Sequence, residues 1–167
     1  MPGSYFGPHR KLNRWEKWDY SDFGFYFVTV CAKNRIEYFG NVEDGMMVLN
    51  EYGKIAMDCW VDIENHFDDV CIDEFIIMPN HVHGIVLLKN ENIAATVQTE
   101  NYDRTKMMLP KIVHGFKSSV TRTINNTQHL FQFGWQKSYF DHIIRNEISL
   151  AKIRQYIISN PINWLED

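Results

Sequence analysis

Short runs rich in β-branched and aromatic residues alternate along the chain with longer segments in which apolar residues recur every three or four positions. Gly24–Cys31, Val70–Met78 and His81–Leu88 are runs of the first kind, and we predict that they are strands. A Pro-Asn turn signal separates the last two, which predicts a hairpin. Residues 135–144 contain an aromatic cluster and are predicted to be extended.

Three segments have helical periodicity. We predict that Asn50 caps a helix over 51–66, that Pro110 starts a second helix in its first turn, and that Asn146 caps a last helix, Glu147–Ser159. The apolar positions are Ile55, Cys59, Ile63 and Phe67 in the first helix, Ile112, Val113, Phe116, Val120 and Ile124 in the second, and Ile148, Ile153 and Ile157 in the last.

The predicted order is strand, helix, strand, strand, helix, strand, and then an added helix. This is the split β-α-β order of a ferredoxin-like sandwich, an α+β fold with an antiparallel sheet and helices on one face. We expect a short hairpin near Asp44 and a long polar loop over 89–109. Residues 1–22 are predicted to be an N-terminal arm and 23–167 a single domain.

Composition narrows the class of protein. Of the 167 residues 45% are hydrophobic and 23% are charged, which excludes disorder as the main state. The chain has no apolar stretch near the ~20 residues that cross a bilayer and no apolar run in its first ten residues, so a cytoplasmic protein without membrane contact is expected. The cysteines, Cys31, Cys59 and Cys71, have no CxxC spacing, which argues against a disulfide scaffold and a cysteine zinc site.

Charge is unevenly distributed, although the net charge is only −4. Residues 37–74 contain eleven acidic residues and one lysine, whereas 104–140 contain six basic residues and no acidic one. Such asymmetry suggests that one face of the protein meets a polyanion while the opposite face stays acidic. The alternative is that both charged faces are simply exposed to solvent.

His81 and His83 flank Val82 in a predicted strand. Because side chains alternate along a strand, both imidazoles are expected on one face and Val82 on the other. The spacing suits two ligands of one metal ion. A hydrogen-bonded histidine pair is the alternative, since polar side chains on a core face need partners.

Five segments in order along the chain resemble the HUH single-tyrosine transposases, in particular the REP-associated tyrosine transposases. The histidine pair lies in MPNHVHGIV, which resembles the His-hydrophobic-His motif that names the superfamily. The other segments are DYSDFGFYFVTVC, LNEYGKIA, GFKSSVTRTIN, and WQKSYFDHIIRNE followed by IRQYIISNPINW.

The resemblance implies a metal-dependent endonuclease and strand transferase that cuts single-stranded DNA at the foot of a hairpin. It assigns the attacking tyrosine to Tyr156 and a third metal ligand to Asn160, beside His81 and His83. Tyr156 and Asn160 are one turn apart and so share a helix face. Packing of Tyr156 at a helix interface and capping of the helix end by Asn160 are the alternative interpretations.

The expected chemistry is a transesterification. Imidazole and amide ligands fit Mg²⁺ or Mn²⁺, and the ion would offset the phosphate charge. A phenol loses its proton only near pH 10 in water, so the tyrosine needs activation. Its attack would give a covalent 5′-phosphotyrosine and a 3′-hydroxyl without ATP.

DNA contacts are expected from the basic arm and from the second helix. The predicted contact residues are Arg10, Lys11, Arg14, Lys111, Lys117 and Arg122. The partner would be single-stranded or hairpin DNA, and a homodimer is left open. The rival function is a DNA- or RNA-hairpin binding module without catalysis. Asp141 and His142 are expected on opposite faces of a strand, most simply in structural roles.

Overall fold

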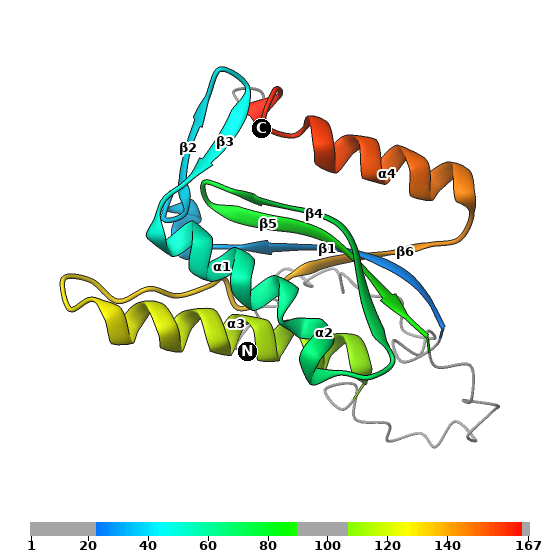
Figure 1. The fold of residues 1–167 in the computed structure, drawn as a ribbon, viewed down its shortest axis with the longest axis horizontal. Helices are drawn as coiled ribbons and strands as arrows, with labels where there is room; N and C mark the ends of the chain where they lie inside the picture. Colours follow the sequence, from blue (N-terminus) through cyan, green and yellow to red (C-terminus); the bar gives the residue numbers. More distant parts are fainter. Residues whose placement is uncertain (1–22, 90–106, 165–167) are drawn as a thin grey trace, which may run out of the picture.

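The computed structural model describes residues 23–89 and 107–164. Figure 1 shows the order and arrangement of the elements. The strands are β1 (Gly24–Cys31), β2 (Gly40–Glu43), β3 (Met46–Leu49), β4 (Val70–Met78), β5 (His81–Leu88) and β6 (Phe140–Ile144). The helices are the 3₁₀ turn η1 (Lys33–Arg35), α1 (Glu51–Val61), α2 (Ile63–His66), α3 (Met108–Thr127) and α4 (Glu147–Ser159).

The main sheet has the strand order β4-β5-β1-β6, and each neighbouring pair is antiparallel. Without the hairpin β2–β3, this is the strand order of the ferredoxin-like sandwich, which confirms the predicted fold class. The register sets Thr29 opposite His83 and Cys31 opposite His81. Directly opposed residues share a face, so β1 supplies the neighbours of both histidines.

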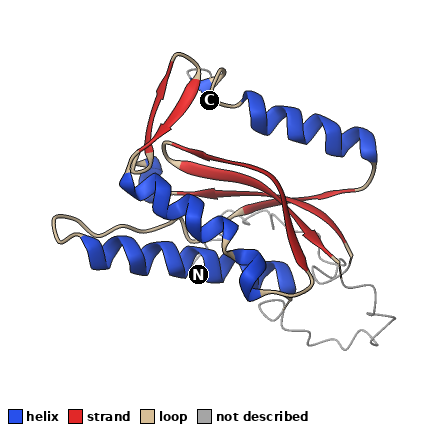
Figure 2. Cartoon of the chain, in the orientation of Figure 1, coloured by secondary structure: helices blue, strands red, loops and turns tan. Residues whose placement is uncertain are grey.

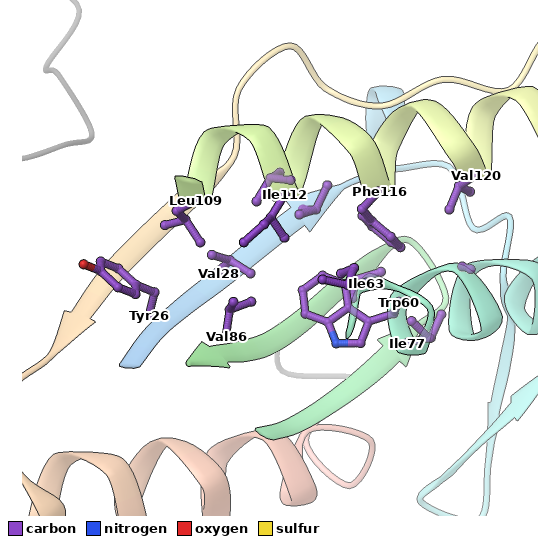
Figure 3. Close-up of a cluster of buried hydrophobic side chains, with 14 of the residues drawn as sticks. Tyr26, Val28, Trp60, Ile63, Ile77, Val86, Leu109, Ile112, Phe116 and Val120 are labelled. Atoms are coloured by element: carbon purple, nitrogen blue, oxygen red, sulfur yellow. The ribbon is translucent and has the colours of Figure 1, made fainter. Parts of the chain in front are cut away.

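Helices α1 and α3 cover one face of the sheet and enclose the larger core (Figure 3). All five apolar positions predicted for the second helix are buried there. Trp60 from α1 is fully buried against Gly84 of β5, where an added methyl group would collide with the indole ring. A glycine between two bulky strand residues therefore makes room for a tryptophan from the helix layer.

Helix α4 lies on the other side of the sheet, across from α1 and α3 (Figure 2). Its buried residues Leu150 and Ile157 join Phe27, Ile85 and Ile144 in a second, smaller core. Ile153 packs against this cluster as expected. The added C-terminal helix is thereby fixed over the sheet face that carries the histidine pair.

Two helix caps have the predicted form. Asn50 Oδ1 accepts a hydrogen bond from the Gly53 amide (3.0 Å), and Asn146 Oδ1 accepts one from the Ser149 amide (2.8 Å). Each side chain satisfies an amide that the first helical turn leaves without a backbone acceptor.

Other details of the helices were predicted wrongly. The 51–66 helix is interrupted at Asp62, which separates α1 from α2 and whose carboxylate is bonded to the side chains of Asn65 and His66. Of the predicted apolar positions, Ile63 is buried, and Ile55, Cys59 and Phe67 are partly buried against the core, whereas the fully buried residues of α1 are Gly53, Ala56 and Trp60.

Three further boundaries or faces also differ from prediction. Helix α3 begins at Met108, two residues before the predicted start, and Pro110 lies in its first turn as predicted. The last strand is limited to Phe140–Ile144 within the segment expected to be extended. Ile148 of α4 is exposed, because the helix faces the sheet with Leu150 and Ile157.

The hairpin β2–β3 has the two-residue turn predicted near Asp44. Asp44 and Gly45 both have positive φ values, 50° and 72°. Two left-handed residues in succession are typical of the type I′ turn, whose twist matches that of antiparallel strands.

The charge asymmetry is not a separation between the two faces of the sheet. The acidic segment includes α1 and α2, the basic segment includes α3, and α1 packs beside α3 in one layer (Figure 1). The predicted division into an acidic face and an opposite basic face is therefore wrong. In the described part of the chain, no helix is both long and apolar enough to cross a membrane.

Candidate active site

His81 and His83 point from β5 toward the α4 side of the sheet, and Val82 points into the larger core, as alternation predicts. The two imidazole centroids are 4.4 Å apart. Both rings are almost completely buried, with 2% and 5% exposure. The central strand therefore presents two adjacent nitrogen heterocycles in a largely apolar setting.

Neighbouring side chains orient each ring. His81 Nδ1 donates to Asn80 Oδ1 (2.8 Å), which puts the lone pair of a neutral ring on Nε2. A hydrogen bond of 2.8 Å joins His83 Nδ1 to Thr29 Oγ1. Phe27 stacks on the His83 ring with a centroid distance of 5.3 Å. These contacts fix the ring planes, as the supporting partners of a metal-binding histidine do.

Burial, together with the smaller effects of the charges of His81 and Arg35, lowers the pKa of His83 from 6.5 to about 3. His83 is therefore neutral at physiological pH. A neutral imidazole can use its lone pair for a hydrogen bond or a cation, but such a low pKa makes it a poor acceptor of a whole proton.

Tyr156 extends from α4 toward the histidine pair. Its hydroxyl oxygen lies 3.3 Å from His83 Nε2, and its ring meets those of His83 and Phe27 edge-on at 5.3 and 6.1 Å. The side chain is 42% exposed, so one side of the phenol faces solvent. The candidate nucleophile and the histidine pair thus come together within a single chain.

Asn160 is the C-cap residue of α4, and its side chain is 1% exposed. It opens the turn that carries Trp164 over His81, with ring centroids 6.0 Å apart. Capping was one of the two interpretations of this residue. The other interpretation, a third metal ligand, agrees with the position of Asn160 at the end of the tyrosine helix, and it stays a prediction.

An ion pair fastens α4 to the edge strand β4. Arg154 Nε and Nη2 donate to the two carboxylate oxygens of Asp73 at 2.7 and 2.6 Å. Asp73 lies where the β4–β5 register shifts, and its Oδ1 also accepts from the Glu74 amide (2.7 Å). The bidentate contact stands two residues before Tyr156 and limits how the helix can tilt or slide.

Arg154→Ala should loosen α4 without unfolding the sheet. The pair is partly exposed, so we expect a loss of at most about 1 kcal/mol, seen as roughly fivefold faster amide exchange in α4. Hydrogen exchange measured by mass spectrometry checks this. Lys152→Ala, an exposed change on the same helix, is the matched control, and equal exchange in both variants would contradict the role of the ion pair.

The same pair has a predictable pH dependence. The hydrogen bond from Arg154 is the main cause that lowers the pKa of Asp73. The stabilisation is therefore complete above the pKa of an unfolded aspartate, about 4, and is lost as the pH falls through the lower folded value. The difference between wild type and Arg154→Ala should accordingly shrink in acid.

The predicted DNA contacts are not gathered around the histidine pair. Lys111, Lys117 and Arg122 belong to α3, in the layer on the opposite face of the sheet (Figure 1). Lys117 Nζ donates to the backbone carbonyls of Gln136 (2.8 Å) and Lys137 (3.3 Å), so it also holds the connection to β6. Arg10, Lys11 and Arg14, with the rest of the predicted arm, lie outside the described residues.

Asp141 and His142 alternate on β6 as expected. Asp141 is buried and opposite Val28, on the face of the larger core, while His142 is exposed and opposite Phe27, on the α4 side. Neither position requires a role in the chemistry.

Sequence analysis did not identify Thr29, Asn80 or Phe27 as parts of the site. Asn80 directly precedes His81, so its closeness to the histidine pair could have been recognised from the sequence. Thr29 and Phe27 lie on a different strand, and only the register of β1 against β5 brings them to the His83 ring.

The donor set suits a hard or borderline divalent cation. Within residues 23–89 and 107–164 no three His, Cys, Asp or Glu side chains form a metal-binding group. A cation here would therefore rely on two neutral imidazoles and uncharged oxygen ligands, such as an amide and solvent. Such a set fits Mg²⁺ or Mn²⁺, with open positions left for an anionic substrate.

No family model matches the chain. An uncharacterized protein of Haemophilus influenzae is 37% identical over 166 residues, covering 95% of this chain and 92% of that protein. A second protein of that organism, assigned provisionally as a REP-associated tyrosine transposase, is 26% identical over 149 residues, covering 86% and 73%. The structure of a REP-associated tyrosine transposase bound to a REP hairpin has the same fold, with a TM-score of 0.57, 17% identity, and 86% and 69% of the two chains covered.

The antiparallel sheet, the paired histidines on its central strand and the added C-terminal helix are the features that the resemblance to the HUH single-tyrosine transposases implies. Together with the relatives, these features confirm the resemblance seen in the motifs. The chain is thus similar in sequence to a protein assigned provisionally as a REP-associated tyrosine transposase and shares its fold with another protein of that group. These likenesses support a transposase role.

Proposed function

We propose that the chain is a metal-dependent endonuclease and strand transferase that acts on single-stranded DNA beside hairpins, with Tyr156 as the covalent nucleophile. One observation carries this proposal: the Tyr156 hydroxyl lies 3.3 Å from His83 Nε2, on the solvent-facing side of a buried histidine pair. The partner is proposed by kinship, since the related transposase of known structure is bound to a REP hairpin.

His81, His83 and Asn160 would hold the divalent cation, Mg²⁺ or Mn²⁺. When bound, it would offset negative charge on the phosphate under attack. Asn80 and Thr29 serve this arrangement by fixing the imidazole planes. The low pKa of His83 keeps its ring neutral, so ligand and substrate meet no positive imidazolium.

The covalent step is an exchange of phosphodiesters. The Tyr156 oxygen forms a bond to phosphorus, the bond from phosphorus to the 3′-oxygen breaks, and the phenolic proton is balanced by the proton gained by the departing 3′-hydroxyl. Packing of the phenol against Phe27 and His83 restricts its rotation, so the attacking oxygen is held near the histidine pair. Because one ester replaces another, a second 3′-hydroxyl can reverse the step and rejoin strands.

The experiment is to incubate the chain with an end-labelled single strand that folds into a hairpin, with Mn²⁺, and then to denature the mixture. A covalent DNA–protein band should form with Mn²⁺ and be absent with a chelator. The fully complementary duplex is the control and should give no band. Hairpin binding without any covalent band, under either metal, would overturn the proposal in favour of a binding module.

A further inference from the structure

A polar pocket opens beside the histidine pair, on the sheet face that carries both histidines. Its volume is about 330 Å³. It is lined from β1 by Thr29 and Cys31, from η1 by Arg35, and from the segment leading into β6 by Gln136, Ser138, Tyr139 and Phe140. Thr29 and Cys31 stand opposite His83 and His81 in the sheet, and Thr29 also forms a hydrogen bond with His83.

The pocket is continuous with the site. Thr29 is paired with Phe140 across β1 and β6 and with His83 across β1 and β5. The ring of Phe140 lies 6.4 Å from that of Phe27, which in turn stacks on His83. A strand of DNA whose phosphate reached His83 would therefore meet this pocket with an adjacent nucleotide.

Arg35 contributes a positive charge to the pocket. Among the residues that the structure describes, Arg35 forms no ion pair, and its side chain is exposed at the pocket. Its charge is close enough to help lower the pKa of His83 and to oppose the rise that burial causes in the pKa of Cys31. An unpaired guanidinium in a cleft attracts phosphate oxygens, which it can bind in a bidentate way.

The backbone around Arg35 is held in an unusual conformation. Asn34 and Arg35 both have φ of 57°, a left-handed region that side chains other than glycine rarely adopt. The Arg35 carbonyl accepts from Asn80 Nδ2 (3.3 Å), and the same Asn80 orients His81. One asparagine therefore couples the position of Arg35 to the histidine pair.

The opposite wall is also fixed. The Gln136 amide donates to the Cys31 carbonyl (2.9 Å), and the Gln136 carbonyl accepts from Lys117 of α3. Lys117 thus supports this wall from the other layer. The wall ends in Phe140, whose ring is 50% exposed, as a surface for base stacking should be.

We propose that this pocket binds the nucleotide next to the cleaved phosphate, with its phosphate on Arg35 and its base on Phe140. The hydroxyls of Thr29 and Ser138 and the amide of Gln136 add donors for phosphate and sugar oxygens. This inference rests on the proposed function for the identity of the strand, but it concerns binding alone. It can therefore be tested without any cleavage.

The test measures binding of a fluorescent hairpin-bearing single strand to the full chain in chelator, by anisotropy at several salt concentrations. Arg35→Ala should weaken binding about tenfold and reduce the salt slope by about 0.7, the value for one phosphate contact with a single strand. Arg35→Lys keeps the charge without the planar fork and should lose less. Lys54→Ala, on exposed α1 surface, is the matched control and should bind as wild type does.

Single modified nucleotides then locate the contact. A neutral methylphosphonate at one phosphate should weaken binding to wild type and have no further effect on Arg35→Ala. An abasic nucleotide at the same position should weaken binding to wild type and have no further effect on Phe140→Leu. Equal effects of the methylphosphonate at every position, or additive losses with Arg35→Ala, would overturn the proposal.

The two proposals fail separately. Suppose that covalent adducts form, but that the losses caused by the methylphosphonate and by Arg35→Ala add up. The pocket would then be rejected, and the nucleophile assignment would stay intact. If the methylphosphonate has no further effect on Arg35→Ala but no covalent adduct forms, the pocket is supported and the catalytic function is rejected. No binding of single-stranded DNA by wild type would reject both.

Discussion

Tyr156→Phe should abolish the covalent DNA–protein adduct, with a fall of at least about 10³-fold in the rate of strand cleavage. Removal of a nucleophile costs an enzyme most of its rate, since the remaining groups can only bind and polarise the substrate. Here the phenol oxygen is the atom proposed to bond phosphorus. The measurement is single-turnover cleavage of the labelled hairpin strand with Mn²⁺.

The substitution is well suited to this question because it changes little else. The phenylalanine ring keeps the edge-on contacts with Phe27 and His83 and loses one hydrogen bond of 3.3 Å, about 1 kcal/mol at most. Tyr52→Phe, on α1 in the other layer, is the matched control and should cleave as wild type does. Cleavage by Tyr156→Phe at the wild-type rate would show that another group attacks.

His83→Ala should reduce cleavage by about 10²–10³-fold and remove its stimulation by Mn²⁺. The substitution deletes one of two proposed imidazole ligands, and it also deletes the group that contacts the Tyr156 hydroxyl. Loss of one preorganised electrostatic contact to a developing charge has an effect of this size in other enzymes. Cleavage rates across a Mn²⁺ titration, together with direct calorimetric titration of Mn²⁺, measure both consequences.

Two further variants separate chemistry from folding. His114→Ala removes an exposed histidine on α3 and should leave both readouts unchanged. Thr29→Val keeps both imidazoles but removes the bond that orients His83 and one hydroxyl of the proposed nucleotide pocket, so it should cost about 10–100-fold. Unaltered Mn²⁺ binding and cleavage in His83→Ala would reject the proposed metal site.

The strands of the main sheet could be predicted because the pattern that identifies a strand lies within a short, continuous stretch of sequence. Alternation along β5 was enough to place His81 and His83 on one face, and the order of elements was enough to predict the sandwich. Periodicity likewise placed Ile153 and Ile157 of α4 against the sheet. The assignment of Tyr156 came from the family resemblance, and the structure places its hydroxyl 3.3 Å from His83 Nε2.

Contacts between distant segments could not be predicted in this way. Arg35 reaches the site from a 3₁₀ turn with left-handed residues, and Gln136 from an irregular segment, neither of which has a periodic pattern. The charge asymmetry misled for a related reason, since α1 and α3 are far apart in sequence yet adjacent in one layer. The pairing of Arg154 with Asp73 likewise depends on where α4 crosses β4.

The central claim concerns which atom becomes bonded to DNA. The most direct test is to digest the trapped adduct with trypsin and nuclease and to locate the remaining nucleotide by tandem mass spectrometry. The account predicts a 5′-phosphoryl nucleotide on the peptide that contains Tyr156, and on that residue within it. A nucleotide on any other side chain would contradict it.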